Sequence, residues 1–149
     1  LKPKESPDAW VVEVVNTMKM GDCDKLEKLL TSFFASIPYS QRRKDDEREK
    51  ERYFQYTFYL VIRMISSFTV LIEKEQSEGR VDCIIETPMF VYIFEFKRDG
   101  SATEALKQIE EKGYVREYAT DNRTIYLIGC NFSSKTGTID DWKSKGKSV

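Results

Sequence analysis

The 149-residue sequence contains no histidine, and this absence excludes several kinds of active site. Without histidine the chain cannot form a Ser-His-Asp or Cys-His catalytic unit. Zinc sites that use histidine are excluded as well, and no C-x-x-C pair offers an all-cysteine site. Acid–base or metal chemistry must therefore use carboxylates, lysine or water, and a metal held by oxygen ligands alone would be a hard ion such as Mg²⁺ or Mn²⁺.

Long hydrophobic runs are also missing. No apolar segment reaches membrane-spanning length and no signal peptide is visible, which predicts a cytoplasmic protein without a membrane partner. Of the three cysteines, Cys83 and Cys130 lie within apolar strand patterns, so we interpret them as buried free thiols in a reducing compartment. The net charge of −1 argues against an indiscriminate nucleic-acid binder but leaves room for a local basic groove.

A chain of this length predicts a single domain. Apolar spacing predicts a first helix over residues 8–20 that Gly21 ends, and a second helix that Asp22 caps and that ends near Pro38. We interpret residues 1–40 as a helical packing segment. The charged run 41–52 favours a solvated helix start over a binding patch, and it leads into an aromatic-rich helix over 53–66.

The stretch 79–97, GRVDCIIETPMFVYIFEFK, reads as two strands joined by a tight turn over 87–90, and a further strand over 68–75 precedes it. Side chains alternate along a strand, so Glu95 and Lys97 share one face. Counting back across the turn predicts three cross-strand pairs, namely Glu86 with Val91, Ile84 with Ile93, and Asp82 with Glu95.

Two carboxylates facing each other on a hairpin need a physical reason. At about 5 Å and an effective dielectric constant of about 20, Coulomb's law gives roughly 3 kcal/mol of repulsion between them. A divalent cation between Asp82 and Glu95 would turn this penalty into a binding site. The alternatives are a slipped register, or a solvated strand end that carries Glu95 and Lys97.

Ser101 followed by Glu104 is a capping box, which predicts a helix that continues towards Tyr114 and places Gln108 and Lys112 on one face. A largely apolar strand over 124–132 follows. Residues 133–149 predict a short extended or turn segment that ends in a polar tail. After the two leading helices the element order is α-β-β-β-α-β, which favours an α/β fold with a mixed sheet flanked by helices.

Several segments together resemble the PD-(D/E)XK nuclease superfamily, and in particular the C-terminal nuclease-like domain of bacterial proteins in which that domain follows an AAA-ATPase-like domain. The segments are GRVD, YIFEFKRDGSATEAL, QIEEKGY, IGCNF and TIDDW, and the resemblance runs over residues 9–142. It implies a restriction-endonuclease-like core over 41–142, with 143–149 as a mobile tail. Because the chain begins with Leu1, we expect it to be a fragment of a longer protein.

The resemblance also implies roles for individual residues. Asp82 and Glu95 match the metal-binding acidic pair, assisted by the main-chain carbonyl of Phe96. Lys97 matches the lysine that orients or activates the attacking water and offsets charge on the phosphate. Two further positions match supporting residues, Gln108 on the following helix and Glu51 as the first-helix glutamate that holds a metal-bound water. At this last position Glu47 or Glu49 is an alternative.

These assignments predict a Mg²⁺- or Mn²⁺-dependent nuclease that acts on DNA rather than RNA, with its oligomeric state open. Four basic residues follow the motif and either track a nucleic-acid backbone or are solvated helix charges: Arg98, Lys107, Lys112 and Arg116. One alternative is a catalytically silent binding or regulatory module that serves an ATPase-like domain. Another is a structural α/β domain whose polar cluster is a salt-bridge network. The chain has no G-x-x-x-x-G-K sequence for nucleotide binding.

Overall fold

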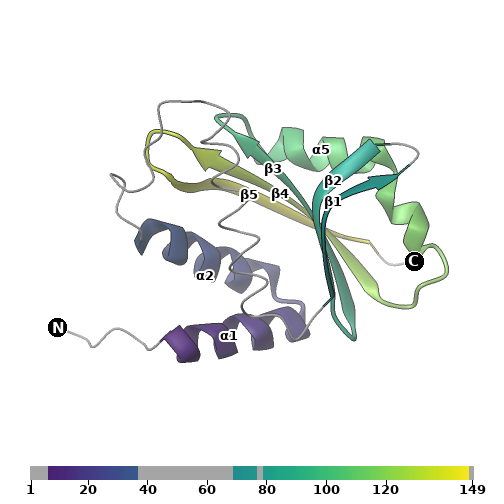
Figure 1. Cartoon of the computed structure of the whole chain (residues 1–149), viewed down its shortest axis with the longest axis horizontal. Coiled ribbons are helices and arrows are strands. Elements are labelled where there is room, and N and C mark those ends of the chain that lie inside the picture. The colour runs from purple at the N-terminus through teal and green to yellow at the C-terminus, as the bar shows by residue number, and fades with distance from the viewer. Residues whose placement is uncertain (1–6, 37–68, 77–78, 148–149) are drawn as a thin grey trace.

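The computed structural model describes residues 7–36, 69–76 and 79–147, and it shows a mixed β-sheet with helices on both faces (Figure 1). The sheet has five strands in the order β1-β2-β3-β4-β5. Strands β1, β2 and β3 pair antiparallel, β3 and β4 pair parallel, and β4 and β5 pair antiparallel. The bounds are β1 Thr69–Gln76, β2 Gly79–Glu86, β3 Phe90–Arg98, β4 Thr124–Ser133 and β5 Thr138–Lys147.

Among the described elements, two helices cover one face of the sheet and one helix covers the other (Figure 1). The first face carries α1 (Pro7–Met20) and α2 (Cys23–Ser36). The second carries α5 (Ala102–Lys112), which makes the crossover between the parallel strands β3 and β4 and continues into the 3₁₀ helix η1 (Tyr114–Tyr118). The expected mixed α/β fold is confirmed. The predicted helices over 41–66, and with them Glu51, lie outside the described residues.

The predicted hairpin register is confirmed along the part of β2 and β3 whose pairing is resolved. Glu86 pairs with Val91 and Ile84 pairs with Ile93. The turn closes as counted, because the Thr87 amide donates a 2.8 Å hydrogen bond to the Phe90 carbonyl. The resolved pairs end at Cys83 with Phe94. The same register carried one residue further sets position 82 opposite Glu95, although the Asp82 side chain lies outside the described residues.

Alternation along β3 separates two apolar cores. Tyr92, Phe94 and Phe96 pack against α1 and α2, where the Tyr92 hydroxyl donates a 2.6 Å hydrogen bond to the Met18 carbonyl. Val91 and Ile93 point to the other face and pack beneath α5 with residues such as Ile109, Tyr114 and Leu127. Glu95 and Lys97 continue the second series, so β3 aims both motif side chains at the face that α5 covers.

Helix α1 ends and helix α2 begins where the sequence predicts. Gly21 takes a left-handed conformation at φ 73° after α1, and a Cβ there would lie 2.5 Å from the Phe90 ring. The Asp22 carboxylate then accepts a 3.1 Å hydrogen bond from the Lys25 amide at the start of α2. All three cysteines are buried free thiols, as expected for Cys83 and Cys130.

The C-terminal segment differs from the expectation of a polar tail from residue 143. Lys143–Lys147 form the second half of β5 and pair with β4 as far as the pair Ile125 and Lys147. The segment orders despite its polar composition because β4 satisfies its backbone groups and α5 engages its lysines. Lys145 lies 2.9 Å from the Glu110 carboxylate, and Lys143 donates a 2.7 Å hydrogen bond to the Thr103 hydroxyl.

Candidate functional site: a buried carboxylate beneath helix α5

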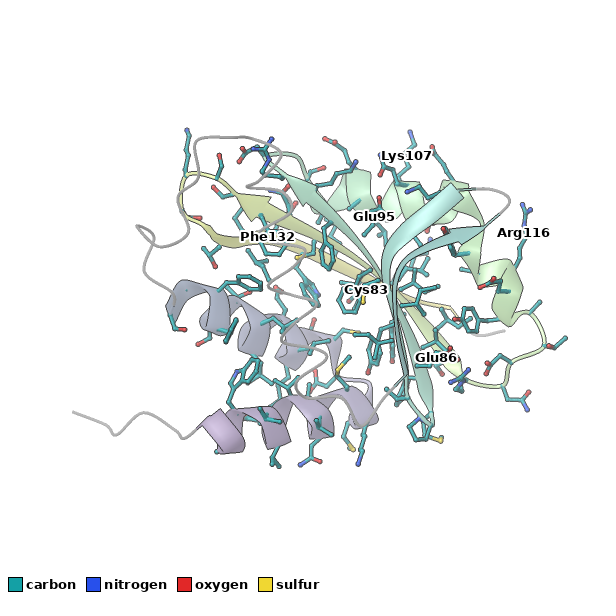
Figure 2. The ribbon with its side chains drawn as sticks, in the orientation of Figure 1. Cys83, Glu86, Glu95, Lys107, Arg116 and Phe132 are labelled. Carbon is teal, nitrogen blue, oxygen red and sulfur yellow. The ribbon has the colours of Figure 1, made fainter. Side chains whose placement is uncertain are left out.

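Glu95 is a charged side chain inside the apolar layer between the sheet and α5. The residue is 5% exposed, and it lies on β3 next to the buried Ile93 on the same face. Figure 2 shows it projecting from β3 beneath α5. Burial of an ionised carboxylate is costly unless charged or hydrogen-bonding partners compensate for the lost water. The position of Glu95 therefore requires charged or hydrogen-bonding partners close by.

Lys112 provides a cation from the last turn of α5. Its Nζ donates a 3.2 Å hydrogen bond to Glu95 Oε1, and the lysine side chain is 27% exposed against 7% for the glutamate. The sequence predicted Lys112 either as a contact to a nucleic-acid backbone or as a solvated helix charge. The structure instead brings its ammonium group to the motif glutamate, and Gln108 lies half-buried one turn earlier on the same helix.

Lys97 follows two residues after Glu95 on the same face of β3 and is half-buried. Its cross-strand partner on β4 is Asn131. Lys107 and Arg116 are exposed and point away from the sheet, from α5 and η1 respectively (Figure 2). Lys107 lies 3.9 Å from Glu111 on its own helix, which is a weak surface pair. Arg98 lies on the opposite face of β3 from Lys97, as alternation requires.

The loop between Lys97 and α5 is held by polar side chains that sequence reasoning missed. Asn131 is 1% exposed, and its Oδ1 accepts a 2.9 Å hydrogen bond from the Gly100 amide while its Nδ2 donates a 2.8 Å bond to Asp140. Asp141 on β5 accepts a 2.8 Å bond from the Ala102 amide at the start of α5. A polar asparagine within the apolar strand 124–132 was the available signal, because a buried amide side chain must find partners.

Two more contacts fix the same loop. Ser101 caps α5 as predicted, since its hydroxyl accepts a 3.1 Å hydrogen bond from the Glu104 amide. Asp99 adopts φ 52° and accepts bonds of 2.8 and 2.6 Å from the amide and hydroxyl of Ser134 in the β4–β5 turn. Helix α5 thus starts at a position set by β4 and β5, and that start determines where Gln108 and Lys112 lie relative to Glu95.

Gly129, the cross-strand partner of Glu95 on β4, lets α5 approach the sheet closely. A Cβ at this position would lie 2.3 Å from the Ala102 carbonyl oxygen and 2.9 Å from the Leu106 amide nitrogen. Both atoms belong to the backbone, so no side-chain rotation relieves the contact. The glycine is therefore what allows the helix to lie directly over Glu95.

A second polar cluster lies at the other end of the hairpin, around Arg123. Its guanidinium contacts Glu86 and Asp121 at 2.6 Å each and donates a 3.0 Å bond to the Thr87 carbonyl. The hydrogen bonds from Arg123 lower the pKa of Asp121 to about 2. Burial, followed by the charge of Glu86, raises the pKa of the Tyr118 hydroxyl nearby. This cluster connects the hairpin turn to the start of β4, and we assign it a structural role.

Within the parts of the chain that the structure describes, no group of three or more histidine, cysteine, aspartate or glutamate residues could hold a metal ion. The side chain of Asp82, the predicted partner of Glu95, is not among them. The chemistry of the donor set nevertheless suits a hard cation, because Glu95 supplies carboxylate oxygens and neighbouring backbone carbonyls supply oxygen.

No helix among the described residues is both long and apolar enough to cross a membrane.

The sequence matches the profile of the PD-(D/E)XK nuclease superfamily over residues 49–142, and the chain belongs to that superfamily. Its mixed sheet flanked by helices is the restriction-endonuclease-like architecture. A similar protein in Azotobacter chroococcum mcd 1 carries the description "Uncharacterized protein in vnfD 5'region". The two are 31% identical over 129 residues, which cover 85% of this chain and 25% of the relative. The chain therefore spans about a quarter of that relative's length. No solved structure matches the chain.

Proposed function

We propose that this chain is a metal-dependent nuclease domain that hydrolyses phosphodiester bonds, in DNA in preference to RNA. The observation that carries the proposal is the buried carboxylate of Glu95, at the end of β3 and within the residues matched by the superfamily. A structural protein gains nothing by placing this charge between a sheet and a helix, since an apolar residue would pack there at lower cost. A site that must bind a cation does need it.

Three oxygen donors form the proposed metal site. In this proposal Glu95 contributes its carboxylate and Phe96 its main-chain carbonyl. Asp82 contributes a second carboxylate, which would lie opposite Glu95 if the register that pairs Cys83 with Phe94 continues by one residue. A hard cation bound there supplies a water of lowered pKa and polarises the phosphate oxygens. Mg²⁺ and Mn²⁺ suit all-oxygen sites, and the chain has no histidine for softer metals.

Lys97 is the proposed catalytic lysine. It shares a face with Glu95, and its compact ammonium orients the attacking water and offsets the charge that builds up on the phosphate. Gln108 supports the site from α5, and Glu51 is the proposed holder of a metal-bound water. Lys107 and Arg116, both exposed, are proposed contacts to the nucleic-acid backbone. Lys112, beside Glu95, and Arg98, at the end of β3, are further proposed contacts.

A second candidate function is a catalytically silent module that binds nucleic acid or regulates an AAA-ATPase-like partner domain. The contact between Lys112 and Glu95 favours it, because the buried carboxylate already has a cationic partner from the protein itself. The ATPase-like partner is itself a proposal, as is a cytoplasmic location, which the three buried free thiols support.

A cleavage assay on the 149-residue chain tests both candidates. Supercoiled plasmid, single-stranded DNA, branched DNA and RNA are each incubated with Mg²⁺, Mn²⁺ or a chelator. We expect Glu95→Gln, Lys97→Met and Asp82→Asn to lower the rate by roughly 100-fold or more. The matched controls Glu110→Gln on α5 and Lys143→Met on β5 change exposed residues of the same types and should cleave at the rate of the unmodified chain.

The results of the cleavage assay distinguish the two candidate functions and test the preference for DNA. Cleavage that survives Glu95→Gln, or that a chelator does not stop, would contradict the proposed metal site. Silence on every substrate, with nucleic acid still bound in a gel-shift assay, would support the binding module instead. RNA cleaved faster than every form of DNA would contradict the substrate preference.

A further inference from the structure

The ion pair between Lys112 and Glu95 creates a conflict with a bound metal ion. The ammonium lies 3.2 Å from Glu95 Oε1, while a hard cation binds a carboxylate oxygen at about 2.0–2.6 Å. Both positive charges would then share one carboxylate in a layer that excludes water. Coulomb repulsion between them is strong at such short separations and low dielectric constant. The lysine and the metal therefore compete for Glu95.

The geometry of α5 shows how Lys112 reaches the carboxylate and how it can leave. Lys112 is the last residue of the helix, and Gly113 follows in a left-handed conformation at φ 69° that ends it. The side chain is 27% exposed, so its tip reaches inward while part of its stem lies at the surface. A rotation about its side-chain bonds would carry the ammonium into solvent without moving the helix.

We propose that Lys112 is an internal counter-ion that holds Glu95 in the metal-free protein and leaves the carboxylate when a divalent cation binds. This inference rests on the proposed function, because it assigns to Lys112 the control of cation affinity at the same site. Lys112 is a positioning residue in the empty site and lowers the affinity of the site for metal.

The test compares Mn²⁺ affinity by calorimetry at low salt and neutral pH, using the 149-residue chain and single variants. Removal of the competing ammonium in Lys112→Met should tighten Mn²⁺ binding by roughly 10- to 100-fold, the usual worth of a hydrogen bond to a charged group. Lys112→Arg keeps the charge and should stay near the original affinity. Lys145→Met is the matched control. It removes a different lysine–glutamate ion pair, the exposed one between Lys145 on β5 and Glu110 on α5.

Thermal unfolding gives a second readout that does not depend on activity. Without metal, Lys112→Met should melt at a lower temperature than the unmodified chain, because Glu95 loses its ion pair with Lys112. Mn²⁺ should raise the melting temperature of Lys112→Met by more than it raises that of the unmodified chain. Lys112→Gln repeats the test if the methionine variant does not fold. Mn²⁺ binding that is unchanged or weaker in Lys112→Met and Lys112→Gln would overturn the inference. Mn²⁺ binding as tight in Lys112→Arg as in Lys112→Met would overturn it as well.

Glu95→Gln separates this inference from the proposed function. If Glu95→Gln leaves Mn²⁺ binding unchanged, the proposed metal site itself is wrong. If Glu95→Gln abolishes binding while Lys112→Met fails to tighten it, the metal site stands and only the counter-ion role of Lys112 is refuted.

Discussion

Replacing Gly129 by alanine tests whether the close approach of α5 to the sheet builds the site around Glu95. The added Cβ would lie 2.3 Å from the Ala102 carbonyl oxygen, 2.9 Å from the Leu106 amide nitrogen and 3.1 Å from the Ala105 Cβ. Restoring ordinary van der Waals distances requires the helix to move outward by about 1 Å. Such a shift would stretch the 2.8 Å bond between Ala102 and Asp141.

The expected cost follows from overpacking against atoms that cannot rotate away. Overpacked cores lose about 1–3 kcal/mol, and we expect the upper half of that range because the two closest atoms belong to the backbone. For a chain of this size each kcal/mol lowers the melting temperature by about 2–4 °C. Urea unfolding and thermal melting both measure this change, and the cleavage assay reports whether Lys112 and Gln108 still align with Glu95.

Gly146→Ala is the matched control on the neighbouring strand. A Cβ at Gly146 would meet only the ring of Tyr126, at 3.2 Å, and Gly146 is exposed. This variant should unfold within about 0.5 kcal/mol of the unmodified chain, because surface substitutions usually do. If Gly129→Ala is as stable and as active as Gly146→Ala, then the contact between α5 and β4 does not build the site.

Three further substitutions test other contacts. Asp141→Ala should cost about 0.5–2 kcal/mol in urea unfolding because the Ala102 amide loses its acceptor, and Asp141→Asn should recover most of that loss. Tyr92→Phe should cost about 1 kcal/mol through its buried bond to the Met18 carbonyl, and an unchanged urea midpoint would contradict this. Arg123 lowers the folded pKa of Asp121 to about 2, below its unfolded value of about 3.9. The resulting stability is present above about pH 4 and is lost as the pH falls towards 2. Between about pH 4 and pH 2 the melting temperature of Asp121→Asn should therefore decrease less than that of the unmodified chain.

The parts of the fold that were predictable depend on short-range patterns. The hairpin register followed from the alternation of side chains and the length of the turn at Thr87, and the pairs of Glu86 with Val91 and Ile84 with Ile93 confirm it. The start of α5 followed from the Ser101 cap. The prediction of a tail after residue 143 was wrong up to Lys147, since an edge strand needs few apolar residues of its own.

The sequence by itself determined the helices α1, α2 and α5, the strands β1 to β4, and which face of β3 carries Glu95 and Lys97, because helix caps, turns and strand alternation act over a few residues. Only the tertiary structure decided that Lys112 meets Glu95 and that Asn131 and Asp141 hold the start of α5. These contacts join residues 17, 31 and 39 positions apart, respectively. No local periodicity encodes such distances, because they depend on how closely α5 packs against β4 and on the pairing of β4 with β5.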